Sequence, residues 1–563
     1  MSEQPEAHPS DDQAELPLVG LRGAVERSTA GLIEGAAEAT GGRPFTLERP
    51  KRAEFGDYST NAALLLAPSV GAPPREVAER LGVSLAELLG ESLERFEVAG
   101  PGFVNLFLSD GWCRGALAGV LAAGDRFGGG AAAPAERINV EFVSANPTGP
   151  MHVGHARNAA YGDSLARILA FHGHSVEREF YVNDAGSQIA KLGETLRAVA
   201  RGEPVPEDGY KGDYVPGLAA RLPGAADMEP VALGRAAVEL MLEQMRGSLA
   251  RFGVEDFDRW AYESALHEGE PSPVERTLAV LAEQGRTYTE DGALWLRTSE
   301  FGDDKDRVLV RSSGEHTYFA SDIAYHQDKR ERGFERQIDV WGADHHGYIA
   351  RMKAAYEALG GDPDELELLI MQLVHLVQSG ERAQMSKRAG EFVTLDELMS
   401  EIGVDAARWY LLARSHDTTL DIDIDQAREQ SAENPVYYVQ YAHARIASML
   451  IRAGAGRVSE AVAAVRRGEL PEEPMHPSER SLVLGLLGFP GEVGDAALRR
   501  APHRVAAVAL ELAQGFTAFY RDCRVVGSEP AAVESFRIAL SVAAMRTIAR
   551  CLDLLGVSAP ERM

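Results

Sequence analysis

The chain has 563 residues, of which 45% are hydrophobic and 25% charged, so it is too long for one core and has the composition of a globular protein with several domains. Its three cysteines lie far apart and form no CxxC pair, which argues against a disulfide framework and a cysteine-based zinc site. The net charge of −28 is mild evidence against a nucleic-acid partner, although an acidic protein can still carry one basic stripe.

The N-terminal part of the chain begins with an acidic, polar segment, residues 1–15, which we expect to be disordered. This segment lacks the basic and apolar regions of a signal peptide, and no apolar run approaches membrane-spanning length, so we expect a cytoplasmic protein without a membrane partner. Residues 16–122 are expected to form a small α+β domain, in which the turn at 100–102 joins two strands into a hairpin. The Gly-, Ala- and Pro-rich residues 123–137 are expected to be a linker.

The middle of the chain, residues 138–425, alternates short strand-like runs with helical patterns. Such alternation predicts a Rossmann-like α/β domain with a parallel sheet and a site at the carboxyl ends of its strands. Residues 195–290 break the alternation and predict a largely helical insertion. Residues 426–563 have helical patterns and predict an all-α bundle, with the polar segment 456–477 as a surface loop. The expected fold class is therefore α/β, with a small α+β domain before the Rossmann-like domain and a helical bundle after it.

The stretch 138–169 begins with apolar–polar alternation, continues with Gly and Pro, and ends with apolar residues at helical spacing, which predicts a strand, a turn and a helix. His152 and His155 lie at the start of that helix with Gly154 between them. Two imidazole donors beside the free N–H groups of a helix N-terminus suit a phosphate. The alternatives are two ordinary histidines, or an HxxH metal pair for which no nearby carboxylate completes a ligand set.

A second motif, residues 380–392, carries Lys387 and Arg388 between Gly380 and Gly390. A glycine-hinged loop of this kind can bring a cation to a transferring phosphate. The alternative is a solvated basic loop, and the motif alone does not decide between the two.

The two motifs taken together resemble the HIGH and KMSKS pair of class I aminoacyl-tRNA synthetases. Four stretches are also similar to arginyl-tRNA synthetase: VEFVSANPTGPMHVGHARNAAYGD, FYVNDAGSQI, GADHHGY and LDLLGVSAPERM. The resemblance, which extends over residues 16–563, implies that the protein activates L-arginine with ATP and Mg²⁺ and transfers it from arginyl-adenylate to its tRNA. It also implies that the helical bundle reads the anticodon and that the N-terminal domain contacts tRNA, with FGDYSTNAA as the candidate stretch. We expect a monomer without a protein-bound structural metal.

The resemblance also implies roles for single residues. Catalysis would consist of positioning and charge stabilisation by His152, His155 and Lys387, without a side-chain nucleophile. The implied ATP-binding positions are His152, Gly154, His155, Gly342, Asp344, His345, Met385, Ser386 and Lys387.

The guanidinium group of arginine is a planar fork of five donors, which should be met by carboxylates and by aromatic or amide groups. By resemblance we expect Glu263 and Tyr318 near the guanidinium, Asp322 and Asn146 near the amino group, and His345 as a further arginine contact. Tyr318 and Asp322 are four residues apart and share one face if their segment is helical. The alternatives are a solvated helix residue for Glu263 and a helix cap or ion-pair partner for Asp322.

Aromatic and arginine side chains read single-stranded RNA by stacking. Tyr437, Tyr441 and Arg445 are therefore the candidate tRNA contacts in the bundle, although tyrosines at helical spacing are also typical of a core. Asp184 is a weaker candidate site residue, with a helix cap or a fold-supporting role as its alternative.

One departure from the family pattern is Gln384, which stands where the loop motif usually has Lys two residues before Ser386. The detailed role of the loop stays open, as does whether tRNA must bind before arginine is activated, which the family commonly requires. The alternative functions are another HxGH nucleotidyltransferase, a synthetase-like RNA-binding protein, and a zinc hydrolase that uses His152, His155, His345 and His346.

Overall fold

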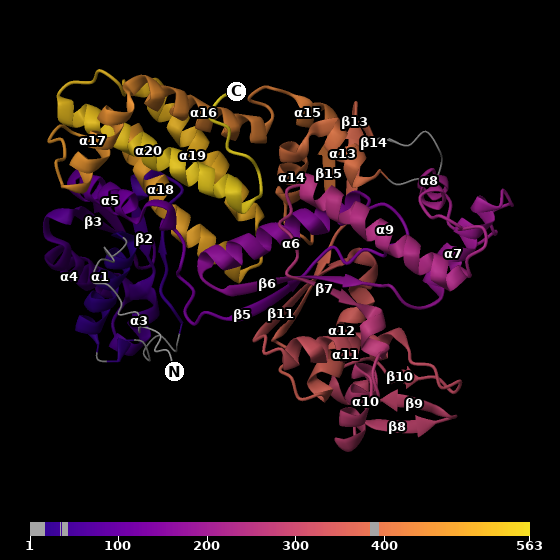
Figure 1. Ribbon diagram of the computed structural model, residues 1–563. Helices are drawn as coiled ribbons and strands as arrows, with labels where there is room; N and C mark the ends of the chain where they lie inside the picture. The colour runs from indigo at the N-terminus through magenta and orange to yellow at the C-terminus, as the bar shows by residue number, and fades with distance from the viewer. Residues whose placement is uncertain (1–16, 34, 37–42, 383–392) are drawn as a thin grey trace, which may run out of the picture.

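The structure of the protein is a computed structural model, shown in Figure 1. Its described residues are 17–33, 35–36, 43–382 and 393–563. The segment expected to be disordered and the loop residues Gln384, Met385, Ser386 and Lys387 lie outside these ranges. The other candidate site residues lie within them.

A five-stranded parallel sheet forms the centre of the middle domain, as the alternating pattern predicts (Figure 1). Its strand order is β12-β11-β5-β6-β7, so the chain leaves β5 for β6 on one side and later adds β11 on the other. In such a sheet a ligand binds at the carboxyl ends of the strands where the order reverses, here between β5 and β11. The strands are β5 (Arg137–Glu141), β6 (Ser175–Val182), β7 (Arg259–Tyr262), β11 (Arg336–Gly342) and β12 (Leu366–Met371).

Helix α6 (Val153–His172) packs on this sheet and completes the predicted strand, turn and helix. Gly162 lets the helix approach closely, because a Cβ atom there would lie 2.1 Å from Phe142 Cγ. Elsewhere α6 contacts the C-terminal bundle, where Ser164 Oγ donates to the Leu554 carbonyl at 2.8 Å. The helix is therefore buried between the sheet and the bundle along most of its length.

Helices α7 (Ser187–Ala200), α8 (Tyr214–Ala220) and α9 (Pro230–Arg251) form a helical insertion with an apolar cluster of its own. The range 195–290 differs from the prediction because it also contains β7, a strand of the central sheet. A four-residue strand is too short to show a clear period of two, and pairing with β6 decides its structure.

Two three-stranded sheets and several helices complete the middle part of the chain. The first sheet is antiparallel. The second is mixed, because β13 pairs antiparallel with β14 and parallel with β15. Their strands are β8 (Thr287–Glu290), β9 (Ala293–Leu296), β10 (Arg307–Val310), β13 (Val374–Gln378), β14 (Glu381–Arg382) and β15 (Leu420–Asp423). The helices are α10 (Pro273–Glu283), α11 (Tyr318–Glu331), α12 (Ile349–Ala358), α13 (Leu395–Ile402), α14 (Val404–Leu412) and α15 (Ile424–Arg428).

The N-terminal domain has a four-stranded sheet in the order β1-β2-β4-β3, with helices packed against it. The turn at 100–102 joins β3 and β4 into the predicted antiparallel hairpin. The elements are α1 (Pro17–Leu32), β1 (Leu47–Glu48), β2 (Tyr58–Thr60), α3 (Ala62–Val70), α4 (Pro74–Leu89), β3 (Leu93–Ala99), β4 (Phe103–Leu108) and α5 (Asp110–Ala123).

The expectation that the stretch FGDYSTNAA contacts tRNA is wrong for its centre, which is buried. Tyr58 is 3% exposed, and the carboxylate of the neighbouring Asp57 accepts a hydrogen bond from Arg480 Nη2 at 2.6 Å. Arg480 belongs to the C-terminal bundle, so this stretch joins two domains. Its polar residues suggest a surface in the sequence only because their partner lies more than 400 residues away in the chain.

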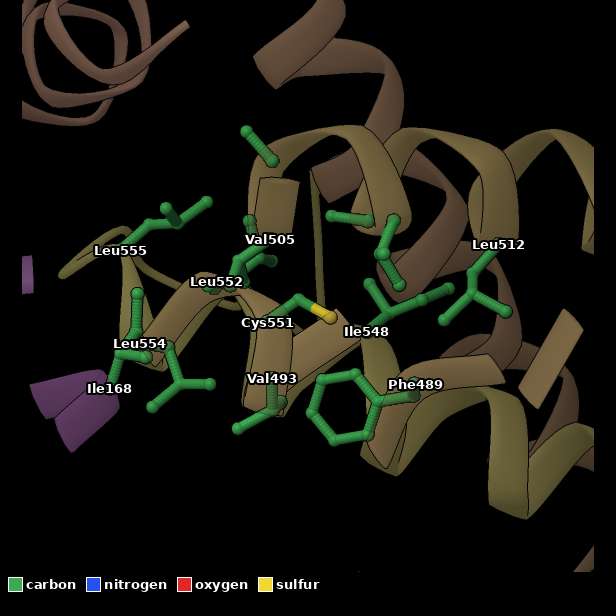
Figure 2. Close-up of a cluster of buried hydrophobic side chains, with 14 of the residues drawn as sticks. Ile168, Phe489, Val493, Val505, Leu512, Ile548, Cys551, Leu552, Leu554 and Leu555 are labelled. Atoms are coloured by element: carbon green, nitrogen blue, oxygen red, sulfur yellow. The ribbon is translucent and has the colours of Figure 1, made fainter. Parts of the chain in front are cut away.

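Helices at the C-terminal end form the predicted all-α bundle. Figure 2 shows part of its core, where Phe489 and Val493 of α18 lie beside Ile548 and Cys551 of α20. The helices are α16 (Pro435–Ala453), α17 (Ala455–Arg466), α18 (Pro477–Leu498), α19 (His503–Asp522) and α20 (Ala531–Leu554).

Two helices of the bundle correct the sequence analysis. The segment 456–477 is helical in its first half, because α17 buries Ala461, Ala464 and Val465, and alanines give only a weak hydrophobic pattern. The sequence analysis expected no apolar run to approach membrane-spanning length. Helix α18 contradicts this, because by length and composition alone it could cross a membrane. Half of its most apolar window is buried inside the molecule, and a core helix of a soluble protein passes the same test.

Candidate active site

A cavity of about 940 Å³ opens at the carboxyl ends of β5 and β11, where the strand order reverses. Its walls include the turn after β5, the start of α6, the start of α11 and the segment after β11. The cavity brings together all the described residues that were expected to bind arginine or ATP. These are Asn146, His152, Gly154, His155, Glu263, Tyr318, Asp322, Gly342, Asp344 and His345.

Two stacked imidazoles form one wall of the cavity. The ring centroids of His152 and His155 lie 3.8 Å apart. His152 Nδ1 accepts a hydrogen bond from Gly154 N at 3.0 Å, and His155 Nδ1 accepts one from His152 N at 3.2 Å. Because Nδ1 is an acceptor in both rings, each neutral imidazole carries its proton on Nε2.

Burial keeps both imidazoles neutral at physiological pH. It lowers the pKa of His152, and together with the neighbouring His152 ring it lowers the pKa of His155 to about 3. Gly154 is needed between them, because a Cβ atom there would lie 2.8 Å from His152 Cε1. The wall therefore offers hydrogen-bond donors without a full charge at the N-terminus of a long helix, a place that suits anionic oxygens.

Both ends of the predicted cation-bearing loop lie at this cavity. Arg382 and Val393, the described residues on either side of the loop, belong to its lining. Two backbone hydrogen bonds of 2.9 Å join the segment 393–395 to the residues that flank His152. Lys387 itself lies outside the described residues, so its place in the site stays a prediction.

Two carboxyl groups, the buried Glu263 and the half-buried Asp322, line another part of the cavity, its carboxylate end. Glu263 is 4% exposed, in contrast to the solvated helix residue that its sequence context alone suggests. Burial raises the pKa of Glu263 to about 7, and the carboxylates of Asp322 and Asp184 add to this shift. Burial also raises the pKa of Asp322, which accepts a hydrogen bond from Tyr348 Oη at 2.5 Å. This end holds two carboxyl groups close together and suits a cationic ligand.

The remaining residues of this end surround the two carboxylates. Asp184 supports the fold, because it accepts hydrogen bonds from Ser264 N at 2.9 Å and Ser264 Oγ at 2.6 Å and so holds the turn that carries Glu263. Tyr318 begins α11, which confirms that it lies one helical turn before Asp322, and it is 52% exposed. Asn146 is exposed in the turn after β5.

The segment after β11 forms an exposed polar rim. A Cβ atom at Gly342 would lie 2.7 Å from Oδ1 of the exposed Asp344 side chain, which has room to move away. His345 Nδ1 lies 3.1 Å from Asp344 Oδ1, and both side chains are exposed. The rim can offer backbone and side-chain polar groups to a nucleotide.

Several lining residues were missed in the sequence. Glu141 and Tyr181 lie at the carboxyl ends of β5 and β6, and a strand-end position was the signal that could have indicated them. Tyr348, the donor to Asp322, ends the GADHHGY stretch. Outside the lining, Tyr214 of the insertion donates to the Thr148 carbonyl at 2.7 Å, and nothing in its sequence context points to this contact.

The predicted tRNA contacts of the bundle lie together on α16. The rings of Tyr437 and Tyr441 are stacked with centroids 6.1 Å apart, and the guanidinium of Arg445 lies 4.7 Å from the Tyr441 ring. Tyr441 is 41% exposed, so this group is not a buried core. The arrangement offers stacking surfaces at the protein surface.

Within the described ranges, no group of three or more His, Cys, Asp and Glu side chains is arranged to hold a metal ion. His345 and His346, which a zinc hydrolase would use, are exposed on the rim. The expected absence of a resident metal stays a prediction, since the loop 383–392 is outside the description.

Three protein-family models match the chain, and together they span most of its length. Residues 25–108 match the arginyl tRNA synthetase N terminal domain. Residues 117–203 and 261–450 match the catalytic domain of class I (R) tRNA synthetases, and residues 439–563 match the DALR anticodon binding domain.

Similar proteins cover nearly the whole chain. An arginine–tRNA ligase from Desulforudis audaxviator is 44% identical over 569 residues, covering 97% of this chain and 99% of its own. An arginine–tRNA ligase from Kineococcus radiotolerans is 47% identical, covering 92% of this chain and 94% of its own. Among solved structures, the arginyl-tRNA synthetase of Thermus thermophilus is 25% identical with a TM-score of 0.75, covering 96% of this chain and 100% of its own. A putative arginyl-tRNA synthetase from Campylobacter jejuni is 35% identical with a TM-score of 0.73, covering 81% and 100%.

Proposed function

We infer the roles of the cavity from one premise: this chain belongs to the arginyl-tRNA synthetase family and is an arginine–tRNA ligase. It uses ATP to join arginine to tRNA. The matches include the catalytic domain and both flanking domains, which supports this reading over a non-enzymatic RNA-binding protein or another HxGH nucleotidyltransferase.

The proposal places arginine at the carboxylate end of the cavity and ATP at the histidine end. The observation that carries it is the pairing, in one cavity, of the buried Glu263 and the half-buried Asp322 with two neutral imidazole donors at a helix N-terminus. The guanidinium of arginine brings a positive charge to Glu263, and its amino group brings a second one to Asp322. The triphosphate brings the negative charge that the donors of His152 and His155 suit.

Further contacts follow from the lining of each end. Tyr318 and Glu263 contact the guanidinium, Asp322 and Asn146 contact the amino group, and His345 lies between the two substrates. On the ATP side, the rim residues Gly342 and Asp344 contact the nucleoside, and Met385, Ser386 and Lys387 also bind ATP.

The chemistry requires no nucleophile from the protein. The arginine carboxylate attacks the α-phosphorus, the bond to the β-phosphate oxygen breaks, and its electron pair leaves with pyrophosphate. In the second step the 2′-OH of the terminal adenosine attacks the arginyl carbonyl carbon and loses its proton. The acyl–phosphate bond of the mixed anhydride breaks, and AMP leaves with its electron pair. The Nε2–H groups of His152 and His155 hold phosphate oxygens, and Lys387 meets the leaving pyrophosphate. Mg²⁺ enters with ATP as part of the substrate.

The same proposal includes the partners of the outer domains. The stacked group of Tyr437, Tyr441 and Arg445 contacts anticodon bases, because exposed rings and guanidinium planes stack on unpaired bases. The protein acts as a cytoplasmic monomer.

The arginine end is tested with Glu263→Gln. Loss of a charge-assisted contact of about 1.5–3 kcal/mol raises the KM for arginine roughly 10- to 100-fold, while the KM for ATP stays within twofold. The matched control is Glu268→Gln, an exposed carboxylate five residues further on, which leaves both constants unchanged. An unchanged KM for arginine in Glu263→Gln would contradict the placement of arginine at this end.

A further inference from the structure

A fully buried lysine joins three elements beneath the carboxylate end of the cavity. Lys329, on α11, is 0% exposed. Its Nζ lies 2.6 Å from Glu141 Oε2, at the end of β5, and 2.8 Å from Asp339 Oδ1, on β11. Lys329 follows Asp322 by seven residues, so both lie on the same face of α11.

A second cation completes this buried network. His326 Nε2 lies 2.7 Å from Asp339 Oδ2, and its Nδ1 lies 2.7 Å from the Asp322 carbonyl oxygen. Because both ring nitrogens face oxygen acceptors, the imidazole holds both protons. Lys329 and His326 therefore balance Glu141 and Asp339. Apolar residues in place of a buried ion network often give an equally stable fold. Stability alone therefore does not explain why these charged residues are buried here.

The network is tied to a strained turn of the cavity wall. Directly after β5, Val143 and Ser144 have positive φ angles of 68° and 39°, a conformation that is unfavourable for non-glycine residues and especially for valine. Ser144 Oγ donates to Glu141 Oε1 at 2.9 Å and accepts from Tyr181 N at 3.1 Å. Such strain persists only where the surroundings hold it, and this turn leads directly to Asn146.

We propose that Lys329 is a positioning residue that, through Glu141 and Ser144, locks the turn carrying Asn146 to the helix carrying Asp322. The distance between the turn with Asn146 and the helix with Asp322 then stays fixed. A ligand that contacts both therefore binds to a preformed site. This inference rests on the proposed placement of arginine.

The histidine end is held by different contacts, which makes the role separable. His152 and His155 are fixed by the first turn of α6 and by the backbone bonds to segment 393–395. Loosening the network should therefore weaken arginine binding and spare ATP binding.

Two variants break the link at different points. Ser144→Ala removes the hydroxyl that holds the strained turn. The double variant Glu141→Gln, Lys329→Met removes one charge of each sign, leaves Asp339 paired with His326, and keeps an acceptor for Ser144. Each variant should raise the KM for arginine roughly tenfold, because displacement of a contact group by a fraction of an ångström weakens binding. The KM for ATP should stay within twofold of the parent value and kcat within threefold.

Two further variants are measured beside them. Ser541→Ala removes a fully buried hydroxyl that bonds only within α20, and it should leave both KM values at the parent level. Asp322→Asn tests the proposed arginine end itself. Thermal unfolding confirms folding of each variant, and if the double variant does not fold, Ser144→Ala alone decides.

The outcomes separate the two proposals. If Asp322→Asn leaves the KM for arginine unchanged, the placement of arginine is wrong. If Asp322→Asn raises it while Ser144→Ala does not, or if Ser144→Ala raises both KM values equally, the positioning role of Lys329 is overturned and the placement of arginine stands.

Discussion

Burial shifts the pKa values at the two ends of the cavity in opposite directions, and the physical reason is the same at both ends. Removal from water disfavours the charged form of any group, so it raises the pKa of Glu263 to about 7 and lowers the pKa of His155 to about 3. Both groups are thereby moved toward neutrality. The difference is that an incoming cation restores the charge of the carboxylate, whereas the imidazole donates hydrogen bonds without ever needing a charge.

The largest expected effect comes from the histidine end. His155→Ala removes one preorganised donor, which is worth about 3 kcal/mol of transition-state stabilisation, so kcat falls on the order of 100-fold. Steady-state aminoacylation measures this, with His172→Ala, at the other end of α6, as the matched control. A kcat within a few-fold of the parent would show that the histidine wall only shapes the cavity.

The pH dependence separates the two ends. Glu263 is largely protonated below its pKa of about 7, so arginine must displace a proton there, and kcat/KM for arginine falls up to about tenfold per pH unit as the pH drops below that value. The same raised pKa means that the free enzyme is stabilised by proton uptake at low pH and loses this stability as the pH rises through about 7. Profiles of kcat/KM for arginine from pH 6 to 8.5 show the inflection in the parent enzyme and not in Glu263→Gln. Its persistence in that variant would assign it to another group.

The smallest expected effect lies outside the cavity, where a substitution should change neither the arginine end nor the ATP end. Tyr441→Ala removes one stacking surface worth about 1 kcal/mol, so the KM for tRNA rises about fivefold while the KM values for arginine and ATP stay unchanged. Tyr441→Phe retains the ring and should behave like the parent. Equal losses in both variants would point to the hydroxyl, which accepts a hydrogen bond from Arg445 Nη2 at 2.8 Å, as the important group.

Local patterns predicted the histidine end well. Its strand, turn and helix are consecutive in the chain, and the period of apolar residues, the turn formers and the two histidines all lie within about 30 residues. The family resemblance then pointed to Glu263, Tyr318 and Asp322, which no local pattern brings together. The structure places them around one cavity.

Features that depend on distant partners could not be predicted. Lys329 is one lysine in a charged stretch of sequence, and its partner Glu141 is 188 residues away. The polar stretch around Asp57 suggested a surface for the same reason, since its partner Arg480 lies in another domain. The missed helix α17 has a different cause, because its buried face consists largely of alanine.

The close contact of Gly162 with Phe142 has a mechanical consequence. Helix α6 has 20 residues and is about 30 Å long. It packs closely at Gly162, and two residues later Ser164 hydrogen-bonds to the bundle. No flexible joint separates the two attachments. A displacement of the bundle would therefore be transmitted along α6 to its N-terminus, where His152 and His155 lie.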